Sequence, residues 1–354
     1  MPKKIVGTAL LLPLLFISCL SSHALTSDTK RVRVAVLPFN DITSSSINIK
    51  IASVFMAELS KTDFIDVVPL EIIRRNIMAI EPNFLWTEQR GIEKRGRIVW
   101  DVEPKVVEEI VFRTGADYTI YGSISWFNTK WKIDAYLSDS DKNVIRVYSI
   151  YGDKEEEVPE KLENISKETI LLLQRETIVK EAEEEVRRYL GGTYTLPIAI
   201  ERVEILARSF YDSIPLHAIL LNLYLKNKMG YKEKVIDTGL KIIKLYNPSN
   251  DRDTKYLLSL NLDPFDAVAS GYEEKEELNK AVEIREKALQ VFPLYTTRHK
   301  RGIGIAAYNL AKVYEQKGEK VKALQYYKKA ILYLPSESNE FLSAKEKLNL
   351  IEKR

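Results

Sequence analysis

Apolar positions in the first third of the chain follow two different periods. Residues 31–39 form a β-branched run that contains Pro38, and the inner part of this run is apolar at consecutive positions, as in a strand buried on both faces. Residues 49–59 carry apolar side chains at helical spacing, and residues 64–68 predict a second short strand. A strand, a helix and a strand in so short a segment match a βαβ unit. The pattern therefore predicts α/β structure in this part of the chain.

The next segment predicts one helix followed by three strands. Residues 106–112 are apolar at helical spacing and lead to Gly115, a residue type that favours a helix end. Strand-like runs follow at residues 118–126, 131–137 and 144–151, separated by short polar turns. Alternation places two sets of side chains opposite each other across the first turn: Ile120, Gly122, Ile124 and Trp126 against Trp131, Ile133, Ala135 and Leu137. We expect an antiparallel meander with one buried face.

Beyond these strands the apolar positions recur at helical spacing alone. Residues 159–189 predict a long charged helix that ends at the glycine pair 191–192, and with its flanks this helix forms a connector over residues 153–192. Its acidic clusters at residues 155–157 and 183–185 suit a partner-binding surface or, as is more usual, a solvated helix face.

The tail contains an internal repeat, with its best copies at residues 262–295 and 304–337. The first copy is carried by Phe265, Ala269, Tyr272, Ala281, Ala288 and Pro293. The second is carried by Ala307, Leu310, Ala311, Tyr314, Gly318, Ala323, Tyr327, Ala330 and Pro335. This pattern resembles the tetratricopeptide (TPR) repeat, in which small residues let two antiparallel helices approach and aromatic residues fill the space between them. Arg285 stands where the first copy would carry an aromatic side chain.

The two copies are separated by about eight residues more than the usual repeat length of about 34, and residues 296–303 lengthen either the link or the next helix. One helix pair cannot bury its apolar face, so about three pairs are expected. A weaker copy lies at residues 220–248, residues 196–211 predict a capping helix, and residues 338–353 predict a last helix that covers the open end through Phe341, Leu342, Leu348 and Ile351. The fold class is therefore an α/β amino-terminal domain with a mixed sheet and helices over residues 31–152, followed by an all-α TPR superhelical domain over residues 195–354.

TPR arrays generally bind peptides or protein surfaces on a concave face. Four polar side chains fall on the first helix of the best repeat, which usually lines the groove: Tyr308, Asn309, Lys312 and Gln316. Each of them taken alone is more often an ordinary solvated helix residue. Together they form the candidate groove.

The first 24 residues have the layout of a signal peptide: two lysines, an apolar run at residues 5–17, and then small residues. This run is shorter than the roughly 20 apolar residues that cross a bilayer as a helix. Two cleavage sites compete. Residues 22–24 suit an ordinary signal peptidase, while Ser18-Cys19 resembles a bacterial lipoprotein box, with Phe16 in place of the usual aliphatic residue. The protein is therefore expected to be exported to the periplasm, and lipidation of Cys19 would anchor it to a membrane such as the outer membrane.

Two signatures in the first domain resemble a known family. They are Val-Ala-Val-Leu-Pro-Phe-Asn at residues 34–40 and Thr-Gly-Ala-Asp-Tyr-Thr-Ile-Tyr-Gly-Ser at residues 114–123. Their order and the intervening elements are similar to the amino-terminal domain of TolB and its relatives CsgG and FlgO, over residues 31–152 with an insertion at residues 76–104. The resemblance implies envelope assembly or interaction. TolB's β-propeller is absent, and the charged residues 87–97 do not suit a membrane pore.

Composition argues against several other functions. Lysine and arginine number 53 against 50 acidic residues, without a basic block of the kind that binds nucleic acid. A histidine metal site would need His217 and His299 to converge from different repeats. Asp139-x-Asp141-x-Asn143 opens like a calcium loop but lacks its glycine and its last glutamate, which favours a hairpin turn. No phosphate loop, dinucleotide fingerprint or serine elbow occurs in the sequence. We predict no enzyme, cofactor, metal or nucleic-acid partner.

Two hypotheses follow for function. The first is a periplasmic or membrane-anchored adaptor in an envelope assembly that binds other envelope proteins or peptides through its TPR repeats. The alternative is a ring-forming component of an export or flagellar apparatus, which would make the protein a homo-oligomer.

Overall fold

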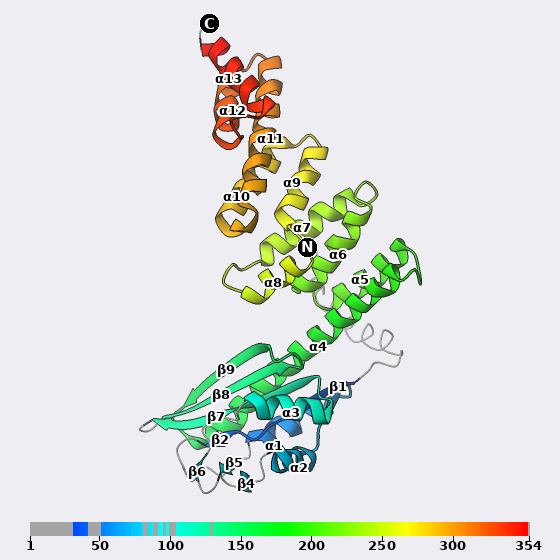
Figure 1. The fold of residues 1–354 in the computed structure, drawn as a ribbon, viewed down its shortest axis with the longest axis vertical. Coiled ribbons are helices and arrows are strands. Elements are labelled where there is room, and N and C mark those ends of the chain that lie inside the picture. The colour runs from blue at the N-terminus through cyan, green and yellow to red at the C-terminus, as the bar shows by residue number, and fades with distance from the viewer. Residues whose placement is uncertain are drawn as a thin grey trace, which may run out of the picture. The chain divides into compact units, whose positions relative to one another are not determined.

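The computed structural model describes residues 31–41, 51–80, 84–87, 91–94, 97–98, 104–127 and 130–352. These residues form two compact units, one up to Gln174 and one from Arg175 onward, which are described separately below (Figure 1). The signal peptide, both expected cleavage sites and Cys19 lie outside the described residues.

The first unit is built on a six-stranded mixed sheet (Figure 1). The strand order is β3 (Ile65–Val67), β1 (Val32–Val36), β7 (Tyr118–Phe127), β8 (Lys130–Asp139) and β9 (Val144–Gly152), and β2 (Asn40–Asp41) also pairs with β7. Strand β1 is parallel to β3 and β7, whereas β7, β8 and β9 form an antiparallel meander. The predicted mixed sheet is confirmed.

The register between β7 and β8 is the one that the alternation predicts. Ile120 pairs with Leu137, Gly122 with Ala135, Ile124 with Ile133, and Trp126 with Trp131. The β8–β9 turn uses its polar residues locally: the backbone N–H of Asn143 donates to Asp139 Oδ1 at 2.8 Å, and Lys142 adopts a φ of 71°. The segment that resembles a calcium loop is therefore a hairpin turn, as predicted.

Helices cover both faces of this sheet, which explains why β1 is apolar at consecutive positions. Val34 and Val36 pack with α1 (Ile51–Leu59) and with the first half of α4 (Val158–Leu190). Ala35 and Leu37 point to the other face and pack with α2 (Leu70–Ile80) and α3 (Pro104–Thr114). Each large apolar side chain buried in these two layers contributes about 1.5–3 kcal/mol.

The insertion and the residues just before it contain elements that were not predicted. Helix α2 begins before the insertion and carries apolar residues at helical spacing: Ile73 and Ile77 are buried, and Ile72 and Ile80 pack against the same core. Three short strands follow, β4 (Phe84–Thr87), β5 (Gly91–Lys94) and β6 (Arg97–Ile98), and they form a separate antiparallel sheet.

The second unit is helical throughout its described length (Figure 1). After the second half of α4, its helices are α5 (Leu196–Ser209), α6 (Ile214–Lys226), α7 (Lys232–Leu245), α8 (Asp251–Ser259), α9 (Pro264–Glu274), α10 (Leu278–Val291), α11 (Thr296–Gln316), α12 (Lys320–Tyr333) and α13 (Asn339–Glu352). Helices α6 and α7, α9 and α10, and α11 and α12 pack as pairs, compatible with TPR-like repeats. The sequence pattern missed α8, which packs on α6. None of the helices in the described ranges is both long and apolar enough to cross a membrane.

The structure resolves where the extra residues between the best repeats lie. Helix α11 begins at Thr296, directly after a 3-10 turn at Pro293–Tyr295, so residues 296–303 lengthen this helix and not the link. The small residues of the repeats are fully buried: Ala269, Ala281, Ala288, Ala307, Ala311, Ala323 and Ala330. Pro293 and Pro335 are exposed where helices end, directly after buried Phe292 and Leu334.

Helix α13 packs on the last helix pair with one change from the expected set. Phe341, Leu348 and Ile351 pack around buried Ala344. Leu342 was expected to join them but is 55% exposed. Its neighbour Phe341 already faces the core, and consecutive helix residues point in directions about 100° apart.

Candidate protein-binding surface

The four candidate groove residues lie within α11, on the part that belongs to the repeat. Asn309, Lys312 and Gln316 are exposed. Tyr308 is half-buried, and its hydroxyl lies 2.9 Å from Ser343 Oγ of α13. The Lys312 ammonium lies 5.6 Å from the centre of the Tyr308 ring, a cation–π contact that orients it. The structure thus leaves three of these side chains open to solvent and engages the fourth in helix packing.

The face of α11 that carries Tyr308, Lys312 and Gln316 continues toward the start of the helix. Residues spaced by three or four share a helix face, and this spacing leads from Tyr308 back to Ile305, Arg301 and Arg298. We call this surface the α11 stripe: Arg298, Arg301, Ile305, Tyr308, Lys312 and Gln316. Its first three residues line a cavity of about 690 Å³. The repeat pattern missed this cavity because the extra turns of α11 are not part of it.

The opposite wall of the cavity is organised by Arg285 of α10. Its side chain is only 5% exposed. Its guanidinium contacts the Asp266 carboxylate and donates from Nε to Glu273 at 3.1 Å. Burial opposes the charge on Arg285, but Glu273 and Asp266 outweigh this effect and raise the pKa of the guanidinium. An ion cluster therefore ties α9 to α10 at the position where the repeat usually carries an aromatic residue.

Helix α11 lies directly against this cluster because residue 302 has no side chain. A Cβ atom at Gly302 would lie 2.5 Å from Arg285 Nε and 2.6 Å from Arg285 Cζ. Both distances are far shorter than an ordinary contact between a carbon and another heavy atom. Gly302 thus sets how closely the cavity's two walls approach.

His299 anchors the first turns of α11. Its side chain is fully buried, and its Nε2 lies 3.1 Å from Asp263 Oδ2 without the alignment of a hydrogen bond. Asp263 is also the N-cap of α9, since its Oδ1 accepts from the Asp266 N–H at 3.0 Å. The His299 ring meets Phe265 edge-on, with 6.4 Å between ring centres. His299 thus joins the first turns of α11 to the start of α9.

His217 lies in a different environment. It is buried in α6, and its Nε2 donates to the Tyr211 carbonyl oxygen at 2.8 Å. Burial lowers the pKa of His217, while the hydrogen bond to Tyr211 works in the opposite direction. It lines a second cavity, of about 430 Å³, together with Asp237 and Lys241. Across the residues that the structure describes, no three histidine, cysteine, aspartate or glutamate side chains are grouped so as to hold a metal ion.

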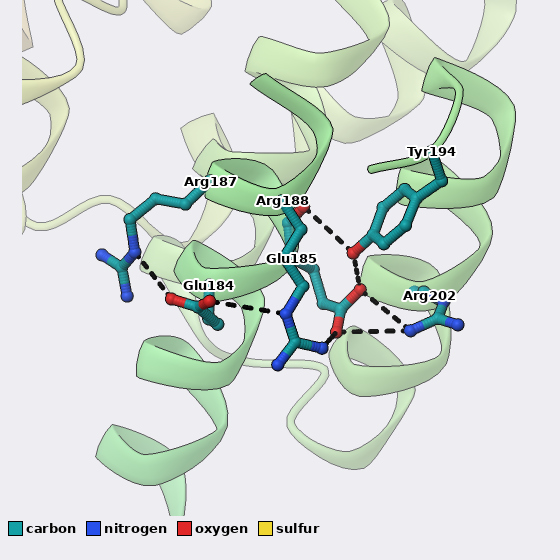
Figure 2. A network of polar contacts seen from close by, with 6 residues as sticks. All are labelled: Glu184, Glu185, Arg187, Arg188, Tyr194 and Arg202. Atoms are coloured by element: carbon teal, nitrogen blue, oxygen red, sulfur yellow. Dashed lines mark hydrogen bonds and ion pairs between the residues drawn. The ribbon is translucent and has the colours of Figure 1, made fainter. Parts of the chain in front are cut away.

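The acidic cluster at residues 183–185 differs from its expected role as a solvated face. Glu185 is only 8% exposed and points toward Tyr194 and Arg202 (Figure 2). It lies 3.1 Å from Arg188 Nη1 and 3.3 Å from Arg202 Nη1, and it accepts a hydrogen bond from the Tyr194 hydroxyl. Helix α5 turns back onto this side of α4, which charge periodicity within α4 alone did not reveal. Glu185 therefore holds the end of α4 against Tyr194 and against Arg202 of α5.

Comparisons with known proteins give no family for the chain. No protein-family model matches it, and no curated protein matches it. Among solved structures, the C-terminal domain of LpoB from Salmonella enterica is 15% identical, with 39% of this chain and 92% of that chain covered and a TM-score of 0.27. Lipoprotein GNA1162 from Neisseria meningitidis is also 15% identical, with 35% and 81% covered and a TM-score of 0.27. A structure of MamA is 20% identical, with 51% and 86% covered and a TM-score of 0.30. These TM-scores all lie below 0.5, so the likenesses carry no argument about function.

Proposed function

We propose that the protein is a non-enzymatic adaptor in a bacterial envelope assembly and binds other proteins through its helical repeats. The α11 stripe is the observation that carries this proposal. It combines exposed polar side chains with a cavity, on an array of packed helices. Helical arrays of this kind offer extended surfaces that suit peptides and protein segments.

The setting of the adaptor comes from the amino-terminal half of the sequence. The expected signal peptide supports export, and the resemblance of residues 31–152 to TolB-type domains supports docking into an envelope complex. In the proposal, the first unit makes this docking contact and a lipid on Cys19 holds the protein to the outer membrane. Mass measurement of the mature amino terminus tests the anchor: a diacylated Cys19 supports it, and a chain that begins at Leu25 removes it.

Photocrosslinking in intact cells tests the binding surface. A photoreactive residue in place of Gln316 should give a discrete crosslinked product, because Gln316 is exposed at the end of the α11 stripe. Gln325 is the matched control, since it is an exposed glutamine on α12 outside the stripe. Equal products from both positions, or none from Asn309, Lys312 and Gln316, would refute the proposed surface.

Size measurement of the purified mature protein separates the adaptor from the ring-forming alternative. A ring predicts one large, discrete assembly that persists on dilution. The adaptor predicts a monomer or a small oligomer.

A further inference from the structure

Cationic side chains on the helical unit are often neutralised by a nearby carboxylate. Lys234 Nζ, for example, lies 2.5 Å from Glu204, and Lys329 Nζ lies 2.7 Å from Glu286. Arg301 and Lys312 of the α11 stripe are among the cations of this unit that are not neutralised in this way. Within the part of the chain that the structure describes, neither of them has a carboxylate partner. The stripe therefore presents two cations to solvent that the protein itself does not neutralise.

The acidic groups beside the stripe are engaged elsewhere. Asp266 and Glu273, which share the cavity with Arg301, are held by buried Arg285. Arg298 lies 3.8 Å from the same Asp266, which is thus shared between two arginines. The cavity lining carries one more positive than negative group. It also offers an apolar rim, because Leu294 is 51% exposed.

At the Lys312 end of the stripe, a neighbouring carboxylate is likewise engaged in other contacts. Glu315 accepts hydrogen bonds from the Tyr327 hydroxyl at 2.7 Å and from Lys347 Nζ at 3.1 Å. The hydrogen bond from Tyr327, together with Lys347, lowers the pKa of Glu315, so this carboxylate stays ionised and paired. Glu315 is not available to neutralise Lys312.

The two cations have a defined spacing along the helix. With a rise of about 1.5 Å per residue, Arg301 and Lys312 are roughly 16 Å apart along the axis of α11. An extended chain advances about 3.3 Å per residue, so it covers this distance in about five residues. A partner segment that meets both cations would then carry its acidic residues about five positions apart.

We infer that the α11 stripe binds an extended acidic segment of a partner protein, with one carboxylate at Arg301 beside the cavity and a second at Lys312. The inference rests on the proposed function and specifies the chemistry of the partner. Leu294 and Ile305 at the cavity add an apolar contact for this segment. Ile305 lies between the two cations along α11, and Leu294 lines the cavity together with Arg301. A single-stranded nucleic acid would also carry negative charge, so binding of a single-stranded oligonucleotide is measured as well.

Binding of a labelled synthetic peptide to the purified mature protein, followed by fluorescence anisotropy, tests the inference. The peptide carries two glutamates separated by four residues, which are serines and leucines. A matched control peptide carries glutamine in place of both glutamates. The protein variants are Arg301→Gln and Lys312→Gln. The control is Lys300→Gln, which removes an exposed cation of α11 that lies off the stripe.

We expect each stripe variant to weaken binding of the glutamate peptide about fivefold, as for an exposed ion pair. The Lys300→Gln control should change it less than about twofold, and added salt should weaken binding further. Equal binding of the glutamine peptide, equal losses in all three variants, or preference for a single-stranded oligonucleotide would overturn the inference. If neither peptide binds while a photoreactive residue in place of Gln316 still gives a crosslinked product in cells, the inference of an acidic segment is wrong and the adaptor proposal stands.

Discussion

Single residues decide how the helix pair α9–α10 is held together. Arg285 occupies a position where an aromatic side chain is usual. The sequence shows this replacement but not how it changes the contacts between the helices. The consequence depends on Asp266 and Glu273, which lie seven residues apart on α9 and meet Arg285 only after α9 and α10 pack. The charged residue at this core position is accommodated because acidic residues recur at helical spacing on the neighbouring helix and pair with it.

Arg285→Ala should destabilise the protein. Removing one partner of a buried ion pair costs about 3–5 kcal/mol. Asp266 and Glu273 keep 28% and 33% of their side-chain surface exposed, so water compensates in part and we expect a loss of about 2 kcal/mol. Urea denaturation measures this change. Arg298→Ala is the control, because Arg298 is 51% exposed and should matter by less than about 0.5 kcal/mol. Equal losses in the two variants would argue against the cluster.

His217 should make stability depend on pH. Burial lowers its pKa in the folded state, so the unfolded state takes up the proton first as the pH falls below the ordinary histidine value of about 6.5. The free energy of unfolding should therefore fall between neutral and mildly acidic pH. His217→Gln removes this titration and leaves an amide that can donate to the Tyr211 carbonyl, so its loss of stability on acidification should be smaller. Urea titrations of both proteins at two pH values test this, and identical pH dependence would contradict it.

At the scale of elements, prediction succeeded where one periodicity dominated. The β7–β8 register follows from strict alternation, and the helix pairs follow from small residues at fixed spacing. It failed at α2, whose helical spacing of apolar residues is present in the sequence but was not assigned to a helix, and at Glu185, where a later helix covers a charged face. The cavity beside α11 depends on two extra turns of helix that no repeat pattern includes.

Gly302→Ala tests how tightly α11 is seated. In an ordinary helix interior, alanine is more stable than glycine by about 1 kcal/mol. Here the new Cβ would meet the Arg285 guanidinium, and we expect a net loss of about 1–2 kcal/mol, as for overpacking in a core. In a double variant with Arg285→Ala the clash is absent, so the two changes should not be additive. Additive losses would mean that the close approach at residue 302 is unimportant.

For the whole molecule, overall charge hides local charge. The chain has 53 basic and 50 acidic residues, and this balance predicts no preferred partner. The helical unit nevertheless leaves Arg301 and Lys312 unneutralised on one stripe, because the neighbouring acids are bound by Arg285, Tyr327 and Lys347. Charge count therefore cannot reveal a surface that forms only when the helices pack.

Helix α13 covers one apolar face of the helical array, since it packs on the pair α11–α12. Terminal repeats of such arrays need a cap with a polar outer face to remain soluble. Phe341→Ala should destabilise the protein by about 2 kcal/mol, because Phe341 packs on the last helix pair and truncation of a partly buried aromatic leaves a cavity. Leu342→Ala removes a neighbouring apolar side chain that is 55% exposed and should cost less than about 0.5 kcal/mol. Deletion of residues 339–354 should go further and cause association that increases with protein concentration, as measured by light scattering. A truncated protein that stays monomeric with an unchanged melting temperature would show that the array does not depend on this helix.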